Sequence, residues 1–124
     1  MDEFYSLDQL KDLEEGWWFY DHAWSLLHTI IKSIEGSSIL DVGCGTGLAL
    51  SVIQSINPER ECIGIEPTEG FSEFWKLRNL NIKRGNALSI PLENNSIDFV
   101  YSSHVIEHVD DHATCVREMI RVAK

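Results

Sequence analysis

The sequence predicts an α/β fold in which helices cover both faces of a parallel β-sheet. From residue 38 onward, short segments rich in β-branched residues alternate with segments of helical periodicity, which is typical of right-handed βαβ units. The expected strands are nearly continuous apolar runs, as in sheets buried on both faces. A glycine-rich turn links the first strand to the helix after it. In such sheets, ligands bind beyond the carboxyl ends of the strands, where the strand order reverses.

The composition indicates one globular domain. The chain has 124 residues, of which 44% are hydrophobic, and its formal net charge of −10 disfavours binding to nucleic acid or to an anionic membrane surface. It contains no apolar run long enough for a membrane span, and its acidic N-terminus does not resemble a signal peptide. Three cysteines without C-x-x-C spacing favour neither disulfides nor a zinc site, so we expect a reduced, cytoplasmic compartment.

The first 36 residues have the periodicity of helices. Ser6 and Gln9 form a capping-box pattern at the start of the first helix. A second helix is expected over residues 21–34, with an apolar stripe made of Trp24, Leu27, Ile31 and Ile34. We therefore expect an N-terminal helical cap over residues 1–36 and a sheet domain over residues 37–124.

Strands and helices alternate in the second part of the chain. Strands are expected at residues 38–42, 61–66, 81–85 and 97–102, and helices at 48–56, at 70–77 and from the capping residue Asp111 onward. The expected apolar stripes are Leu48, Val52 and Ile56 in the first of these helices, and Val116, Met119, Ile120 and Ala123 in the last.

The glycine turn at residues 41–47 (D-x-G-x-G-x-G) is the strongest indication of a ligand site. Glycines there permit positive φ angles and close approach of a ligand, and the helix N-terminus adds a partial positive charge. A nicotinamide dinucleotide site would need a glycine in place of Leu48, and a P-loop would need a lysine after Gly47. The carboxylate of Asp41 suits a cationic ligand better than a pyrophosphate. A tight turn without a ligand is the alternative, which three alternating glycines disfavour because they weaken strand and helix.

Two polar residues follow the next strands. Glu66 ends the second strand about twenty residues after the turn, where an acid can accept hydrogen bonds from both hydroxyls of a ribose. Asn86 follows the third strand, and its amide can bond the edge of an adenine ring. The alternatives are a solvated carboxylate for Glu66 and a turn asparagine for Asn86.

Four motifs stand in order between Ser38 and Lys124: LDVGCGTG, IGIEP, GNALSIPLENNSIDFVYSSHVIEHV and REMIRVAK. Together they resemble the class I S-adenosylmethionine-dependent methyltransferases, in the subgroup typified by small-molecule methyltransferases. The resemblance implies a Rossmann-like sheet, of which this chain would hold four of seven strands in the spatial order 3-2-1-4, without most of the acceptor half. It also implies S-adenosylmethionine as the cofactor and a small molecule as the methyl acceptor.

The resemblance implies which residues would hold the cofactor. Asp41 and the turn residues Gly43, Cys44, Gly45 and Gly47 would line its methionine part, and Glu66 would hold the ribose hydroxyls. Pro67, Asn86 and Ala87 would surround the adenine, and Ser103 and His104 would lie beside the sulfonium. Many family members have an aspartate in place of Asn86, so this chain has one charge fewer there.

The aromatic run Trp17-Trp18-Phe19 is similar to a segment of some family members, in which an arginine-containing helix follows it and covers the cofactor. Here His22 or its neighbours stand where the arginine would be. Packing of the aromatic side chains onto the sheet is the alternative role for this segment.

A histidine cluster follows the fourth strand. His104, Glu107 and His108 spell H-x-x-E-H, a metalloprotease pattern, but they follow a parallel strand and no third ligand is signalled. Some related methyltransferases have E-x-x-E-H here and bind a divalent cation, whereas this chain has His104 in place of the first glutamate. We expect no metal, and Glu107 and His108 would then hydrogen-bond locally. His104 and His108 are the candidates for a general base.

The sequence thus leads to three hypotheses of function. The first is a methyltransferase, or its cofactor-binding part, and the second is a non-catalytic module that binds S-adenosylmethionine. A nicotinamide dehydrogenase is a distant third because of Leu48. The apolar strand at 97–102 would form an edge of the sheet, so we also expect self-association through this edge, or its completion by a partner.

Overall fold

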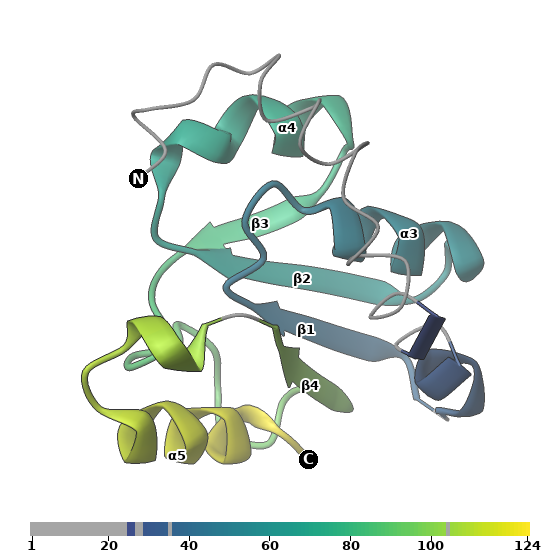
Figure 1. Ribbon diagram of the computed structural model, residues 1–124. Helices are drawn as coiled ribbons and strands as arrows, with labels where there is room; N and C mark the ends of the chain where they lie inside the picture. Colours follow the sequence, from purple (N-terminus) through teal and green to yellow (C-terminus); the bar gives the residue numbers. More distant parts are fainter. Residues whose placement is uncertain (1–24, 27–28, 35, 104) are drawn as a thin grey trace. The chain divides into compact units, whose positions relative to one another are not determined.

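The computed structural model describes residues 25–26, 29–34, 36–103 and 105–124 (Figure 1). The chain divides into two compact units, residues 1–34 and 35–124. In the first unit, residues 25–26 and 29–33 are helical, within the helix expected over 21–34. The helix expected to start near Ser6, the run Trp17-Trp18-Phe19 and His104 lie outside the described residues.

A four-stranded parallel sheet forms the centre of the second unit. Its strands are β1 (Ser38–Val42), β2 (Glu61–Glu66), β3 (Asn81–Arg84) and β4 (Phe99–Ser102). They lie in the order β3-β2-β1-β4, and all pairings are parallel. The expected fold class and strand order are thus confirmed. The strand order reverses between β1 and β4, which is where ligands bind in sheets of this kind.

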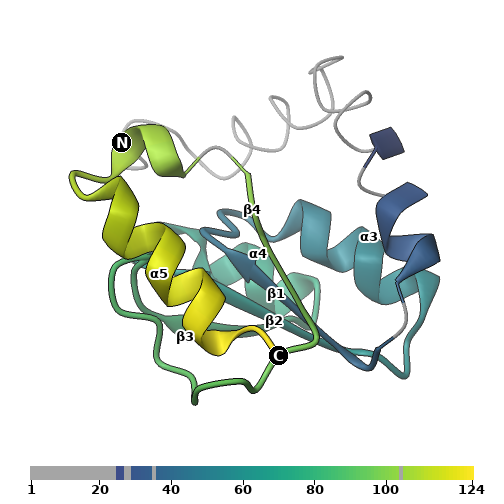
Figure 2. The same cartoon turned by 90° about the horizontal axis from the view of Figure 1, so that it is seen from below.

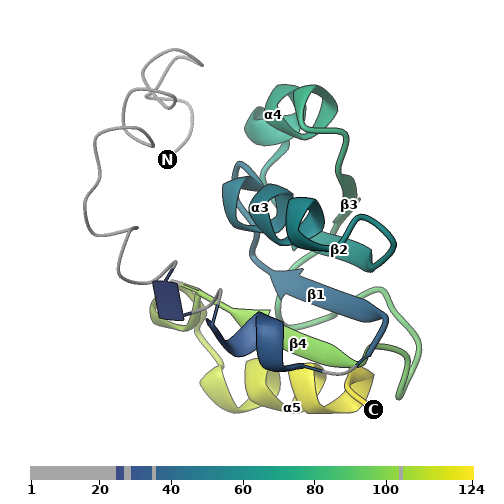
Figure 3. The ribbon, with the colours of Figure 1, turned by 90° about the vertical axis from the view of Figure 1, so that its right-hand side faces the viewer.

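Helices lie on both faces of this sheet. Figure 2 and Figure 3 show α3 (Leu48–Ile56) and α4 (Ser72–Leu77) on one face and α5 (His112–Val122) on the other. The short 3₁₀ turns η2 (Glu69–Phe71) and η3 (Ile106–His108) precede α4 and α5. In the described part of the chain, every helix is too short or too polar to cross a membrane.

The main apolar core lies between the sheet and α5. Its buried residues are Leu40, Val42, Ile63, Ile65, Ala87, Ile90, Ile97, Cys115 and Val122. Because side chains alternate along a strand, Asp41 and Glu66 point to the opposite face, toward the side of α3 and α4. The two acids therefore avoid the main core while remaining at the carboxyl ends of buried strands.

The buried face of α3 differs from the expected stripe. Leu50 and Ile53 are the buried residues of this helix, whereas Val52 is 37% exposed. Apolar residues occupy more than one face of α3, so its periodicity alone does not select the face that meets the sheet.

The buried face of α5 is also rotated from the expected one. Cys115 and Val122 are buried and Met119 packs against the same core, whereas Val116 and Ile120 are exposed. The expected stripe left out Cys115, a small residue that is well suited to close packing.

The strand β4 begins at Phe99, two residues later than expected. The carboxylate of Asp98 accepts hydrogen bonds from the N–H groups of Ser37 and Ser38, at 2.8 and 3.0 Å. These bonds, together with those from the serine hydroxyls, lower the pKa of Asp98. Asp98 thereby ties the start of β4 to the start of β1.

The backbone that follows α5 pairs with Ile97, just before β4. The Ile97 N–H donates to the carbonyl of Val122 at 3.0 Å, and its carbonyl accepts from the N–H of Lys124 at 2.9 Å. This pairing is parallel and joins Ile97 to Ala123. The last residues of the chain therefore lie in the position of a neighbouring strand, on the side of β4 that faces away from β1.

Candidate cofactor site

The glycine turn connects β1 to α3 in a left-handed backbone conformation. Gly43, Gly45 and Gly47 have φ angles of 79°, 56° and 81°. Residues with a Cβ adopt such angles only at a cost in free energy. The N–H groups of Gly43 and Cys44 both donate to the carbonyl of Ile65, at 2.7 and 3.1 Å. These bonds fix the turn against the end of β2.

The three glycines of the turn have different surroundings. A Cβ on Gly43 would overlap with the side chain of Val105, and a Cβ on Gly47 would overlap with Leu80. A Cβ on Gly45, in contrast, would meet no atom of the described chain within 4 Å. Packing within the protein therefore requires Gly43 and Gly47, whereas Gly45 borders space that a ligand can enter.

Glu66 lies at the end of β2 and is 7% exposed. Its Oε1 atom accepts a hydrogen bond from the N–H of Gly45 at 2.9 Å, and its Oε2 atom accepts one from the N–H of Thr68 at 3.0 Å. Each carboxylate oxygen has two lone pairs. The Glu66 carboxylate is thus held against the turn and can accept a further hydrogen bond on each oxygen.

Two side chains from the region of α4 hold the turn in place. The indole Nε1 of Trp75 donates to the carbonyl of Gly45 at 2.7 Å, and Nη1 of Arg78 donates to the carbonyl of Thr46 at 2.9 Å. Neither residue could be predicted from a local sequence pattern, because these bonds join side chains to backbone about thirty positions earlier. The one available signal was the indole N–H, which needs a partner when a tryptophan is buried.

Asp41 and Tyr101 form a polar pair on adjacent strands. The phenolic hydroxyl of Tyr101 donates to Oδ2 of Asp41 at 2.8 Å, and Asp41 is 3% exposed. The two residues are register partners in the pairing of β1 with β4. Tyr101 was not predicted from the sequence, because its place beside Asp41 depends on the register of β4 against β1.

Burial raises the pKa of Asp41 to about 7. The hydrogen bond from Tyr101 opposes this shift, and the negative charge of Glu66 adds to it. Burial and the charge of Asp41 also raise the pKa of the Tyr101 phenol. Near neutral pH the Asp41 carboxyl therefore exchanges between its neutral and ionised forms, and a cation beside it would favour the ionised form.

Cys44 contributes its backbone and its bulk to the turn. Burial, together with the charges of Asp41 and Glu66, raises the pKa of the Cys44 thiol. The side chain packs toward Gly64 of β2, where an added Cβ would lie 2.7 Å from its sulfur. The thiol is therefore a neutral packing group at neutral pH. Cys62 and Cys115 are also buried free thiols.

The loop after β3 carries the residues expected near an adenine. Oδ1 of Asn86 accepts a hydrogen bond from the N–H of Leu88 at 2.8 Å, as in a turn asparagine. The Asn86 side chain is exposed, so its NH₂ group is the part that can reach a ligand. Ala87 is buried in the main core, which leaves only its backbone for a ligand contact.

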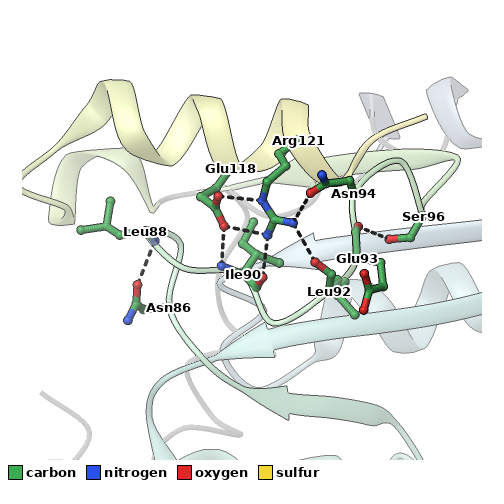
Figure 4. A network of polar contacts seen from close by, with 9 residues as sticks. All are labelled: Asn86, Leu88, Ile90, Leu92, Glu93, Asn94, Ser96, Glu118 and Arg121. Atoms are coloured by element: carbon green, nitrogen blue, oxygen red, sulfur yellow. Dashed lines mark hydrogen bonds and ion pairs between the residues drawn. The ribbon is translucent and has the colours of Figure 1, made fainter.

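Arg121 of α5 anchors this loop (Figure 4). Its guanidinium donates to the carbonyls of Ile90 and Leu92 and to Oδ1 of Asn94, each at 2.8 Å. It also forms an ion pair with Glu118, whose Oε2 accepts from the N–H of Ile90 at 2.8 Å. The loop that carries Asn86 is therefore fastened at its far end to a helix on the opposite face of the sheet.

The remaining predicted residues lie around the carboxyl ends of β2 and β4. The carbonyl of Pro67 accepts a hydrogen bond from Arg84 at 2.8 Å, and Ser103 is exposed directly after β4. Glu107 and His108 are exposed in the 3₁₀ turn η3, where Oε1 of Glu107 lies 3.9 Å from Nε2 of His108. Within the described residues, no three His, Cys, Asp or Glu side chains gather where they could hold a metal.

The arrangement suits a cationic, sugar-bearing ligand. Asp41 and Glu66 lie near the carboxyl ends of neighbouring strands, and the turn between β1 and α3 leaves open space at Gly45. The family model of methyltransferase domains matches residues 40–124. The chain belongs to the class I S-adenosylmethionine-dependent methyltransferases.

Characterised relatives agree with this family. The chain is 32% identical over 96 residues to a demethylmenaquinone methyltransferase of Staphylococcus aureus, covering 73% of this chain and 40% of the relative. It therefore spans about two fifths of the length of the curated relatives that it matches.

Solved structures share the fold of this chain. The YcgJ protein of Bacillus subtilis has a TM-score of 0.71 at 28% identity, covering 84% of this chain and 47% of that one. A SAM-dependent methyltransferase of Thermotoga maritima has a TM-score of 0.71 at 26% identity, covering 93% of this chain and 53% of that one.

Proposed function

We propose that this chain binds S-adenosylmethionine at the carboxyl ends of β1 and β2 and serves in the transfer of its methyl group to a small-molecule acceptor. One observation carries the proposal: two buried carboxylates, Asp41 and Glu66, flank a left-handed glycine turn that is open at Gly45. Both carboxylates are buried and carry negative charge when ionised, so a ligand that brings a positive charge and further hydrogen-bond donors would stabilise the site.

The residues present fit this cofactor. Glu66 would accept hydrogen bonds from the two ribose hydroxyls, because its carboxylate already faces the turn and retains acceptor capacity. Asp41 would face the positively charged methionine part, whose charge would favour its ionised form. The NH₂ group of Asn86 and the backbone of Ala87 would border the adenine.

When bound, S-adenosylmethionine supplies a methyl group on a sulfonium, which needs no further activation for an in-line displacement. The protein then has to align the acceptor, exclude water and, where the acceptor requires it, remove a proton. The segment after β4, with Ser103, His104 and His108, would border the acceptor. His104 and His108 remain the candidates for the general base.

A calorimetric titration with S-adenosylhomocysteine tests the proposed cofactor site. Glu66→Gln is expected to weaken binding about tenfold or more, because a carboxylate is replaced by a group with one acceptor oxygen. Glu61→Gln is the matched control, since Glu61 is the exposed residue at the other end of β2. Equal affinity in both variants and the wild type would contradict the assignment of Glu66.

A methyl-transfer assay separates an enzyme from a non-catalytic binding module. The name of the Staphylococcus aureus relative makes demethylmenaquinone a reasonable first acceptor. We expect label from methyl-labelled S-adenosylmethionine to appear in a small-molecule fraction and not in nucleic acid. Cofactor binding without transfer to any small-molecule pool would favour the binding module.

We also propose that the outer side of β4 pairs with a second copy of the chain. β4 is the last strand in the order, and Ile97 uses its outward N–H and carbonyl for Val122 and Lys124. By the alternation of a parallel strand, the backbone groups of Phe99 and Tyr101 point outward as well. Ile120, 68% exposed on α5, adds apolar surface to the same half of the unit.

Light scattering at tens of micromolar tests self-association. Ile120→Lys is expected to shift a dimer toward monomer, because the new charge would have to be buried. Leu77→Lys is the matched control, since Leu77 is 71% exposed on α4, on the opposite face of the sheet. A monomeric wild type at these concentrations would contradict the proposal.

A further inference from the structure

The pair formed by Asp41 and Tyr101 lies at the point where the strand order of the sheet reverses. β1 and β2 are joined through α3 on one face, whereas the helix that follows β4 lies on the other face (Figure 3). The crevice between the carboxyl ends of β1 and β4 is therefore the expected ligand position. Tyr101 reaches across these two strands with its hydroxyl.

The geometry gives Tyr101 a directed contact with the carboxylate. The Tyr101 hydroxyl donates a hydrogen bond to Oδ2 of Asp41, with 2.8 Å between the two oxygens. The phenol ring is held in turn by Phe99, whose ring centroid lies 6.2 Å away with an interplanar angle of 30°. The Tyr101 ring thus contacts its own strand and bonds the neighbouring one, so its hydroxyl gives the Asp41 carboxylate a preferred orientation.

We infer that Tyr101 is a positioning residue of the cofactor site, whose hydroxyl orients Asp41 so that its other oxygen faces the cationic methionine part of the cofactor. This inference rests on the proposed function. It adds to the residues implied by the family motifs a side chain from the interior of β4, which acts through Asp41 rather than by direct contact with the ligand.

The hydroxyl also influences the pH at which the site carries its charge. Its hydrogen bond lowers the pKa of Asp41, against the opposing effect of burial. The other ionisable groups that act on the pair are Glu66 and Cys62 of β2 and Cys44 of the turn. Without the hydroxyl, the Asp41 carboxyl would ionise at higher pH, and the affinity for a cationic ligand would rise only at higher pH.

The test is a calorimetric titration of wild type and Tyr101→Phe with S-adenosylhomocysteine between pH 6 and 9, a range of about three units around neutrality. We expect the variant to bind about tenfold more weakly at pH 7, with its pH dependence moved to higher pH. Adenosine, which lacks the amino-acid part, is expected to bind both proteins equally. Ser102→Ala is the matched control. It also removes a hydroxyl from β4, but this hydroxyl donates to the carbonyl of Val42 and not to Asp41.

The outcomes separate this inference from the proposed function. A wild type that does not bind S-adenosylhomocysteine would contradict the proposed function. A wild type that binds, with Tyr101→Phe equal to it in affinity and pH dependence, would overturn the role of Tyr101 alone. A variant that loses affinity for adenosine by the same factor as for S-adenosylhomocysteine, relative to the wild type, would indicate a general packing defect and would also overturn the inference. Phenylalanine keeps the ring that stacks on Phe99, so we expect the variant to fold.

Discussion

Burial of the acidic residues Asp41 and Glu66 is unfavourable for the stability of the folded chain. Asp41 and Glu66 are both more than nine-tenths buried, and each raises the cost of ionising the groups around it. The protein compensates with backbone N–H groups at Glu66 and with the Tyr101 hydroxyl at Asp41. Such an arrangement favours ligand binding over stability.

Replacement of Asp41 is expected to stabilise the free protein while weakening ligand binding. The folded pKa of about 7 lies above the ordinary value of 3.8, so the folded state keeps a proton that the unfolded state releases. Stability contributed by this group is therefore present below pH 4 and lost as the pH rises to about 7. Urea unfolding at pH 8 should find Asp41→Asn more stable than wild type, by up to about 4 kcal/mol.

The same comparison at pH 5 provides the control for Asp41→Asn. The difference from wild type should be smaller there, because much of the cost of ionising Asp41 is absent at low pH. Parallel pH profiles of the two proteins would contradict the assignment of this raised pKa.

The glycines of the turn should respond differently to alanine. Gly45→Ala places a methyl group in open space, so it should cost only about 1 kcal/mol of stability for its positive φ yet strongly reduce affinity for S-adenosylhomocysteine. Gly43→Ala also has a positive φ and overlaps with Val105, so its main effect should be on stability. Thermal unfolding and calorimetry together check this, and a Gly45→Ala protein with unchanged affinity would count against a ligand at this position.

The positions of Asp41 and Glu66 near the carboxyl ends of β1 and β2 could be predicted from the sequence, but their hydrogen-bond partners could not. Asp41 and Glu66 stand at fixed places relative to the glycine turn, so the local pattern identifies them. Tyr101, Trp75 and Arg78 act through strand register or through contacts about thirty residues away, which a local pattern does not contain. His104 lies outside the described residues, and its role stays a prediction.

Among the elements, the helix α5 contacts both the apolar core and the loop after β3. Cys115 and Val122 pack into the core under the sheet, while Arg121 and Glu118 reach the loop after β3. The loop therefore depends on α5 for its position, although the two are far apart in sequence. In the last motif of the chain (REMIRVAK), Glu118 and Arg121 bond this loop, whereas Arg117 bonds Thr114 of its own helix.

Replacement of Arg121 should loosen the loop that carries Asn86. Lysine keeps the charge but does not have the planar fork of donors that bonds two carbonyls and Asn94 at once. We expect Arg121→Lys to speed amide hydrogen exchange at residues 88–96 and to weaken binding of adenosine. Arg117→Lys is the matched control, because Arg117 lies one turn earlier and donates to Thr114 of the same helix. Equal exchange in both variants would contradict the anchoring role.

The elements themselves were predictable to different degrees. The ranges of β1, β2 and α3 agree with expectation because prolines, glycines and apolar runs mark their ends. β4 was expected to start at residue 97, but Asp98 bonds the start of β1 and Ile97 pairs with the residues after α5. The predicted buried faces of α3 and α5 were wrong in part. Each helix has apolar residues on more than one face, and packing against the sheet decides which face is buried.

At the scale of the whole molecule, the order β3-β2-β1-β4 determines where a ligand can bind. It places the ends of β1 and β4 at the reversal point and the end of β2 beside them, so Asp41, Tyr101 and Glu66 lie on the same face of three adjacent strands. The chain covers about 40% of the length of its curated relative, so the acceptor and the reaction have to be determined by experiment. The cofactor site, in contrast, can be argued from residues that the chain contains.

The most direct test of the account is a calorimetric titration of the wild-type chain with S-adenosylhomocysteine, with NADH titrated in parallel. We predict saturable binding of S-adenosylhomocysteine with one site per chain and no heat of binding with NADH, because Leu48 stands where a dinucleotide turn needs glycine. No binding of S-adenosylhomocysteine at millimolar concentration, or saturable binding of NADH in its place, would contradict the proposal that the chain binds S-adenosylmethionine.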